Sequence, residues 1–201
     1  MGYEASIEQF KGVLKGGGVR PTMFQVSVNF PRDVVSDGLS ADGDNKVTFL
    51  CKAANLPASQ VNEIEIPFRG RKLKVAGDRS FENWSVTIIN DDSFLIRNAM
   101  EKWSEKIQNH NYALGATRLT TYFSDAFVRQ LDRDASLLRT YAFRGIWPIN
   151  VGDIPLSFEA DGIEEYTVDF AVQYWSAAKE DPGQPSGSPE DITKGTGRIV
   201  S

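Results

Sequence analysis

The stretch that decides the fold covers residues 74–92 and reads Lys74-Val75-Ala76-Gly77-Asp78-Arg79-Ser80-Phe81-Glu82-Asn83-Trp84-Ser85-Val86-Thr87-Ile88-Ile89-Asn90-Asp91-Asp92. Its first part predicts the end of one strand and a tight turn at Gly77-Asp78. A second strand follows, because apolar and polar side chains alternate over residues 84–88. Asp91 or Asp92 then caps a helix that we expect to run to about Gln108. The apolar stripe of this helix is expected to pack against a sheet and consists of Ile96, Ala99, Met100, Trp103 and Ile107.

The rest of the chain is dominated by further alternating segments. They predict strands at 24–30, 47–53, 61–68, 122–132, 137–150, 154–158 and 166–174. Trp147-Pro148 is expected to end regular pairing, and Asp161-Gly162 to turn a hairpin between the last two strands. The fold class is therefore mainly β (α+β), a β-sandwich or partial barrel of about eight strands with one packed helix.

Composition divides the chain into one domain and two flanking segments. Residues 1–19 read as an N-terminal arm with a short helix at 6–14 and a glycine-rich joint at 16–18. Residues 20–175 form the domain, and 31–46 within it reads as a long polar surface loop. Residues 176–201 are rich in Lys, Glu, Asp, Gly, Pro and Ser, which is typical of a flexible C-terminal extension.

Charge and cysteine content exclude several classes of protein. The 201-residue chain has a formal net charge of −5, which argues against a general nucleic-acid binder that must displace counterions with clustered cations. The single Cys51 cannot form an intramolecular disulfide, which favours folding in a reducing cytoplasm. No segment has the roughly 18 consecutive apolar residues of a membrane helix, so no membrane anchor is expected.

The residues that carry most enzyme chemistry are sparse. The only histidine, His110, lies in a polar segment, and Cys51 lies on the apolar face of a predicted strand, where a small core residue is the plain interpretation. One histidine and one cysteine cannot supply the three or four ligands of a zinc site. We therefore expect no enzyme, no metal and no cofactor, while a small enzyme with an unfamiliar site stays an alternative.

Several blocks together resemble one protein family. They are Arg20-Pro21 with Phe24-Gln25-Val26; Cys51-Lys52-Ala53 with Leu56-Pro57; Lys74 to Arg79 with Phe81, Trp84 and Asn90-Asp91; Gly145 to Gly152; and Phe170 to Trp175. In this order they resemble the tail tube proteins of contractile-tailed bacteriophages related to T4, over roughly residues 20–175. The loop at 31–46 and the segment after Trp175 depart from the family pattern.

The resemblance implies a structural role in the virion. Such proteins form six-membered rings that stack into a tube inside the sheath, with the inner sheets of six subunits joined into one barrel. The tube is the conduit for the genome, which passes without specific binding to the protein. The implied partners are further copies of the chain, the tail sheath protein, the baseplate tube-initiator, the tail terminator and the tape measure protein. Assembly would take place in the host cytoplasm.

Within this framework the sequence suggests two groups of functional residues. DNA slides past acidic and neutral polar side chains more readily than past cations, so we expect the following to face the lumen: Glu63, Glu65, Gln130 and Asp132. The basic turn at 69–72 and the charged pair after Gly77 are expected to make contacts between subunits or rings: Arg69, Arg71, Lys72, Asp78 and Arg79.

Besides the small enzyme with an unfamiliar site, three alternatives to the tube protein stay open. Within the same fold, the chain could be a tube-initiating baseplate protein or a secretion-system tube protein of type VI. From a different class, it could be a monomeric ligand-binding β-sandwich. Long tubes of stacked rings would support the tube protein, and a stable monomer with a bound small molecule would contradict it.

Overall fold

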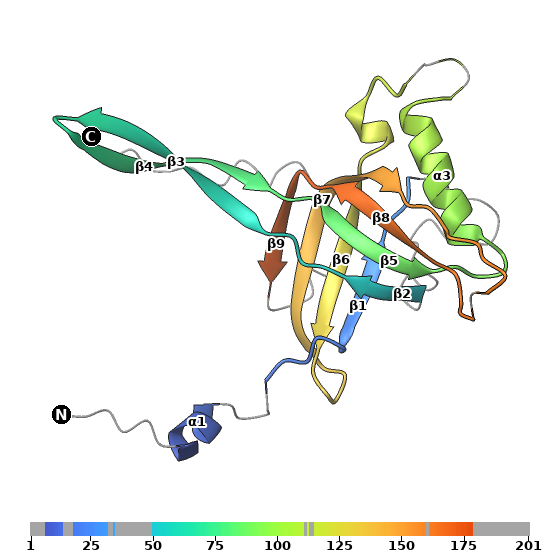
Figure 1. The fold of residues 1–201 in the computed structure, drawn as a ribbon, viewed down its shortest axis with the longest axis horizontal. Helices are drawn as coiled ribbons and strands as arrows, with labels where there is room; N and C mark the ends of the chain where they lie inside the picture. The colour runs from blue at the N-terminus through green and yellow to red at the C-terminus, as the bar shows by residue number, and fades with distance from the viewer. Residues whose placement is uncertain are drawn as a thin grey trace.

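The computed structural model describes residues 7–13, 18–31, 34, 50–110, 112, 115–159 and 161–178. Nine strands and two α-helices lie in these residues (Figure 1). In chain order they are α1 (Ile7–Val13), β1 (Phe24–Val28), β2 (Cys51–Ala54), β3 (Ser59–Phe68), β4 (Arg71–Phe81), β5 (Trp84–Ile89), α3 (Leu95–Ile107), the 3-10 helix η1 (Leu119–Thr121), β6 (Ser124–Leu131), β7 (Leu137–Val151), β8 (Glu165–Ala171) and β9 (Tyr174–Ala178). The prediction of a mainly β chain with one packed helix is confirmed.

Two antiparallel layers share strand β7. The first, which we call the β1–β9 layer, has the order β1-β6-β7-β9, and the second, the β2–β8 layer, continues from β7 through β8 and β5 to β2. β7 pairs with β6 and β9 up to about residue 146 and with β8 from Trp147 onward. Gly145, with φ +62°, lies at this transition, where a left-handed residue bends the strand from one layer into the other.

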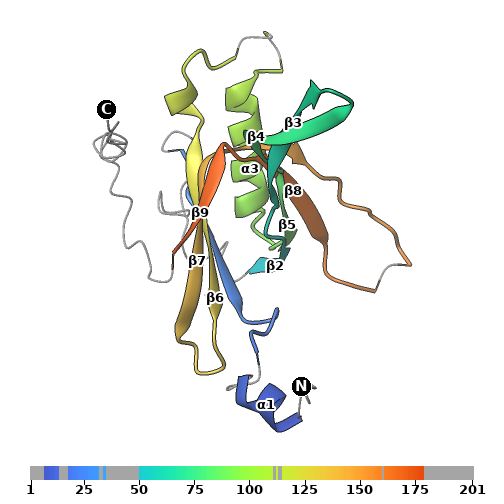
Figure 2. The same ribbon diagram turned by 90° about the vertical axis from the view of Figure 1, so that its left-hand side faces the viewer.

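The core fills the space between the two layers, and α3 covers one end of it (Figure 2). Trp84 of β5 stacks on Phe143 of β7 with ring centroids 4.7 Å apart, and it also contacts Phe170 of β8. The helix contributes the predicted stripe, of which Ile96, Ala99, Met100 and Trp103 are buried. The indole nitrogens of Trp84 and Trp103 donate to the backbone oxygens of Asn55 and Tyr122, so neither buried N–H is left without an acceptor.

A two-stranded arm projects from this body. β3 and β4 pair only with each other in the described residues, and the hairpin extends well beyond the layers (Figure 1). Helix α1 also lies away from the layers, with Ile7 and Phe10 exposed. The predicted helix near residues 6–14 is thus confirmed over Ile7–Val13.

The predicted turn at Gly77-Asp78 is wrong. β4 runs through both residues, and its register against β3 shifts between Val61 and Glu63, so the glycine marks a bulge. A side chain at Gly77 would lie 3.0 Å from the backbone oxygen of Asn62, which explains the preference for glycine there. The turn of the hairpin is Arg69-Gly70, where both φ angles are positive, as a two-residue hairpin turn requires.

The predicted helix cap is also wrong. α3 begins at Leu95 after Phe94, which has φ 51° and makes no side-chain cap. Asp91 instead closes a turn before the helix, since its backbone oxygen accepts from Phe94 N at 3.0 Å and its carboxylate accepts from Ser93. The predicted end near Gln108 is confirmed within one residue.

Three predictions for residues 147–174 need correction. Trp147-Pro148 does not end pairing, because β7 continues to Val151 against β8 with a bulge after Pro148. Residues 154–158 form no strand and belong to a long exposed loop. The strand predicted at 166–174 is two strands, β8 and β9, which follow one another along β7 and part opposite its bend at Gly145.

Some predictions fall outside the described residues. The strand predicted at 47–53 is described from Cys51 onward, and most of the loop at 31–46 and all of 179–201 lie outside the description. The first three residues of the predicted C-terminal extension, Ser176, Ala177 and Ala178, belong to strand β9 and pair with β7.

Candidate assembly surfaces

The arm has one charged face. Glu63 and Glu65 of β3 share it with Lys72 and Lys74 of β4. Lys74 Nζ lies 2.8 Å from Glu63 Oε1, and Lys72 forms an ion pair with Glu65. These side chains are more than a third exposed, and such pairs contribute less than about 1 kcal/mol each to stability. Their arrangement therefore fixes side-chain positions more than it stabilises the hairpin.

The opposite face of the arm is apolar and exposed. Its members are 37–65% exposed: Ile64, Ile66 and Phe68 from β3, and Leu73 and Val75 from β4. The sequence shows the alternation of Ile64 and Ile66 with the two glutamates. A hairpin that leaves one whole face uncovered presents a surface for another chain.

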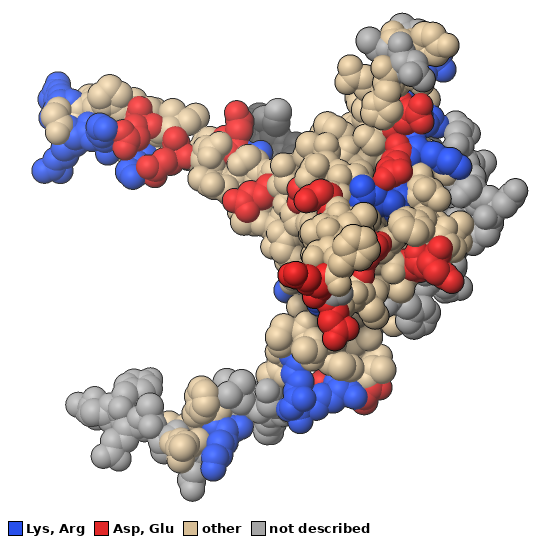
Figure 3. Space-filling model, turned by 45° about the vertical axis from the view of Figure 1, so that its right-hand side comes forward, with Lys and Arg blue, Asp and Glu red and all other residues tan. Residues whose placement is uncertain are grey.

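The tip of the arm is basic. Arg69, Arg71 and Lys72 surround the turn, and Figure 3 shows Lys and Arg gathered at this end with Asp and Glu behind them. The Arg69 guanidinium lies over the Phe68 ring, 5.4 Å from its centroid. Asp78 and Arg79, predicted with this group, lie exposed at the bulge of β4, well back from the tip.

The outer face of the β1–β9 layer carries a second cluster. The guanidinium groups of Arg129 and Arg144 lie over the ring of Phe127 of β6, 5.7 and 5.5 Å from its centroid. Arg144 Nη1 lies 2.5 Å from Asp125 Oδ2, and Arg129 donates to the Ser27 hydroxyl at 3.1 Å. The cations on this face are thus held against the sheet by an aromatic ring, a carboxylate and a hydroxyl.

The four residues predicted to face the lumen lie in two places. Glu63 and Glu65 are on the arm, whereas Gln130 and Asp132 are at the far end of β6. Gln130 is on the same side of β6 as the core residues Ala126 and Val128, because side chains alternate along a strand. Asp132 lies in the β6–β7 turn, where it accepts from Arg133 N at 2.7 Å.

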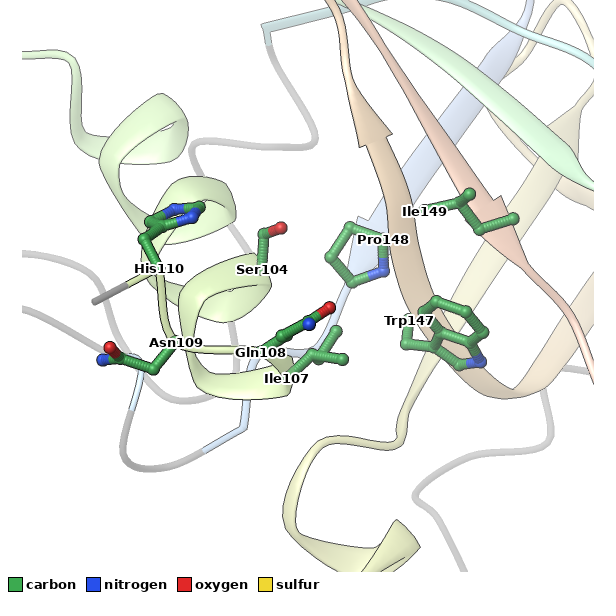
Figure 4. Close-up of a pocket in the computed structure, with 8 residues that line it drawn as sticks. All are labelled: Ser104, Ile107, Gln108, Asn109, His110, Trp147, Pro148 and Ile149. Atoms are coloured by element: carbon green, nitrogen blue, oxygen red, sulfur yellow. The ribbon is translucent and has the colours of Figure 1, made fainter. Parts of the chain in front are cut away.

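The residues considered for catalysis do not form a site. His110 and Ser104 line a shallow pocket at the end of α3, facing Trp147, Pro148 and Ile149 of β7 (Figure 4). The side chains of Ser104 and His110 share no hydrogen bond, although a nucleophile and its general base need one. Burial raises the pKa of the Cys51 thiol to about 12, which keeps it protonated near neutral pH.

The part of the chain that the structure describes contains neither a metal cluster nor a membrane-spanning helix. There, no three His, Cys, Asp or Glu side chains come together as a metal site. No described helix has both the length and the apolar character needed to cross a bilayer.

Comparison with known proteins identifies the family. The family model for phage tail tube proteins matches residues 19–178, which include every strand described above. The chain belongs to the phage tail tube protein family. Relatives with that name include the tail tube protein of Enterobacteria phage T4, 33% identical over 162 residues, or 80% of this chain and 92% of the relative. The tail tube protein of Serratia phage KSP90 is 32% identical over 179 residues, or 88% and 98%.

The fold recurs in contractile injection systems. A chain of the anti-feeding prophage baseplate superposes with a TM-score of 0.60 at 10% identity, covering 80% of this chain and 95% of that one. A chain of the sheath–tube complex of the PVC extracellular contractile injection system gives 0.57 at 12% identity, covering 88% and 100%. Membership of the tail tube family makes this protein a structural component of the phage tail, and hence of the virion.

Proposed function

We propose that six copies of this chain close into a ring through their β1–β9 layers, and that the rings stack head to tail into the tube of a contractile phage tail. The observation that carries the proposal is the four-stranded layer, in which the edge strands β1 and β9 each pair with one strand only among the described residues. The tube is the conduit for the genome, surrounded by the sheath and bounded by a baseplate tube-initiator and a tail terminator, with the tape measure protein inside.

The edge formed by β1 is suited to pairing. Asn29 N donates to Asp125 O and Leu131 N donates to Met23 O, so the odd-numbered residues of β1 bond to β6. In an antiparallel ladder the intervening residues point their backbone groups the other way. Phe24, Val26 and Val28 therefore direct their N–H and C=O groups toward the open edge. Backbone groups at such an edge can form hydrogen bonds with a strand of another chain.

The opposite edge offers a strand of the right direction. Successive strands of the layer are antiparallel, so β9 runs opposite to β1. Joining β9 of one subunit to β1 of the next continues the antiparallel pattern around a ring. Closing the ring removes both free edges of this layer, which would otherwise be open to aggregation. A matching fold in a baseplate reconstruction that was six-fold symmetrised supports the number six.

The outer face of the layer would then line the lumen. The cluster of Asp125, Phe127, Arg129 and Arg144 keeps its cations engaged within the subunit, which limits their attraction for phosphate. Asp132 lies at the rim of this face, and Glu63 and Glu65 extend acidic character along the arm. Gln130, on the core side of β6, lies at the edge of this proposed lining rather than in it.

The arm would make the contact between rings. Its exposed apolar face and its basic tip lie on one extended hairpin, and a contact made with a different surface of the next copy propagates as a filament. Asp78 and Arg79 at the bulge, closer to the body, would meet the same neighbouring ring near the root of the arm.

Electron microscopy of the purified protein tests this function. We expect long tubes of stacked rings from the unmodified chain. Arg71→Glu should shorten or abolish the tubes while far-ultraviolet circular dichroism stays unchanged, and Lys102→Glu, an exposed charge reversal on α3, is the matched control. Single rings that never extend would favour a tube-initiating baseplate protein, and a monomer at all concentrations would contradict the proposal.

A further inference from the structure

We propose that the tip of the arm docks onto the 152–165 loop of a subunit in the adjacent ring, with the Phe68 side chain seated between Leu156 and Ile163 of that loop. The inference rests on the proposed stacking of rings and names the surface that receives the arm. The 152–165 loop follows β7 and ends at Glu165, the first residue of β8; its described residues are 152–159 and 161–165.

The loop combines apolar exposure with one sign of charge. Leu156 is 81% exposed, Ile163 is 74% exposed, and Phe158 is fully exposed. The same segment contains five carboxylates and no Lys or Arg: Asp153, Glu159, Asp161, Glu164 and Glu165. Large apolar side chains held this far out of the core mark a contact surface.

The root of the loop is fixed to the body. Gly152 N donates to Thr167 O at 2.7 Å, and Arg97 of α3 donates to Gly152 O at 2.7 Å. At the other end, Asn90 N donates to Glu164 O at 2.8 Å. A loop with a fixed root presents its tip in one place, so less ordering is needed when a partner binds.

The loop also contains a hollow of suitable chemistry. A pocket of about 320 Å³ is lined by Pro155, Leu156, Ser157, Gly162, Ile163, Glu164 and Glu165. An aromatic side chain placed in such a pocket, with charged groups at the margin, is the usual form of a strong contact between proteins. Glu164 and Glu165 also line this pocket, where Glu164 accepts from Asn90 Nδ2 at 2.9 Å and Glu165 pairs with Lys52 at 2.6 Å. The remaining acidic side chains of the loop are those of Asp153, Glu159 and Asp161.

The arm has the complementary chemistry. Phe68 is 65% exposed at the end of β3, and Ile66 and Leu73 continue the apolar face behind it. Arg69 and Arg71 flank Phe68 at the turn, so a basic tip with an apolar centre meets an acidic loop with an apolar hollow. Opposite charges at the margin fix orientation and raise the rate of encounter.

The occupant must be a second copy of the chain. In Figure 1 the arm extends to the left of the body and the loop lies at its right, so the two surfaces do not meet within a subunit. Two different and mutually complementary surfaces on one chain produce a head-to-tail contact that repeats without closing. This is the symmetry that a stacked tube needs.

Cysteine cross-linking tests the pairing directly. Arg69→Cys combined with Asp161→Cys, on a Cys51→Ala chain, should give disulfide-linked ladders after mild oxidation of tubes. Each single cysteine should give none, and Arg69→Cys with Lys102→Cys is the matched control pair. Tubes that form without ladders would overturn this pairing and leave ring stacking intact. Absence of tubes from the unmodified chain would instead overturn the proposed function.

A charge exchange covers the case in which the cysteine variants do not assemble. Arg71→Glu and Glu159→Arg should each reduce the sedimentable tube fraction by about tenfold, because like charges then face each other. The double variant should recover most of that loss. Failure of the double variant to exceed either single variant would contradict the docking of the arm on this loop.

Discussion

Arg97 of α3 holds the end of β7: its Nη1 donates to the backbone oxygen of Gly152 at 2.7 Å. The same guanidinium lies over the ring of Tyr166, 4.9 Å from the centroid, and its Nε donates to Glu101 at 2.6 Å. Helix, strand β8 and the root of the 152–165 loop therefore meet at one side chain. The helix that covers the core also positions the surface that we propose receives the arm.

Replacing Arg97 should loosen that junction. Arg97→Ala is expected to lower the free energy of unfolding by about 1–3 kcal/mol, because the Gly152 oxygen loses a charged donor and the cation–π contact with Tyr166 is lost. Urea denaturation measures the change, and tube length measured by microscopy should fall with it. Lys102→Ala, exposed on the same helix, should stay within about 0.5 kcal/mol of the unmodified protein. Equal effects of both substitutions would contradict the role of Arg97.

The aromatic core and the aromatic tip should respond differently to truncation. Phe143 is buried and stacks on Trp84, so Phe143→Ala should cost about 3–5 kcal/mol of stability. Phe68 is exposed, so Phe68→Ala should leave the denaturation midpoint of the subunit almost unchanged but impair stacking. A large loss of subunit stability from Phe68→Ala would show that the apolar face of the arm is covered within the subunit.

Gly145 should resist substitution more than Gly162. At Gly145 the φ of +62° is strained for any residue with a Cβ, and that Cβ would lie 2.7 Å from the Gln173 side chain. Gly145→Ala should therefore destabilise the subunit by about 1–3 kcal/mol. Gly162 has nothing within 4 Å of an added Cβ, so Gly162→Ala serves as the control. The comparison is made by thermal denaturation, and a neutral Gly145→Ala would show that β7 can bend elsewhere.

The Cys51 thiol should label slowly. Burial disfavours the charged thiolate, so the pKa is raised to about 12 and the thiol stays protonated through neutral pH. The rate of alkylation should still be rising tenfold per pH unit at pH 9.5, where an ordinary thiol approaches its plateau. Labelling in guanidinium provides the reference rate of the unfolded chain. A midpoint of the alkylation rate near pH 8.5 in the folded protein would refute the burial of this thiol.

The sequence predicted the strands of the body well, because each has one face in the core. Val26, Val128 and Val168 lie at alternating positions that end up buried between the layers. The stripe of α3 was equally informative, since Ile96 and Trp103 recur at helical spacing on the face that packs inward. Local periodicity reports burial within one subunit, and these elements are buried in that way.

Prediction from local periodicity failed for the arm and for the 152–165 loop. Ile64 and Ile66 alternate as a core strand does, yet they are exposed in the subunit. We propose that the contact between rings covers them. Leu156 and Phe158 also alternate and wrongly predicted a strand, although Pro155, immediately before Leu156, disfavours one. The Arg97–Gly152 contact spans 55 residues, and no local pattern could indicate it.

The central claim is that the β1–β9 layer forms the inner wall of a closed ring. A cryo-electron microscopy reconstruction of self-assembled tubes tests it most directly. We predict six subunits per ring, β9 of each subunit paired antiparallel with β1 of its neighbour, and Phe127 facing the lumen. A ring in which the backbone groups of Phe24, Val26 and Val28 remain unpaired, or in which the β2–β8 layer lines the channel, would contradict the account.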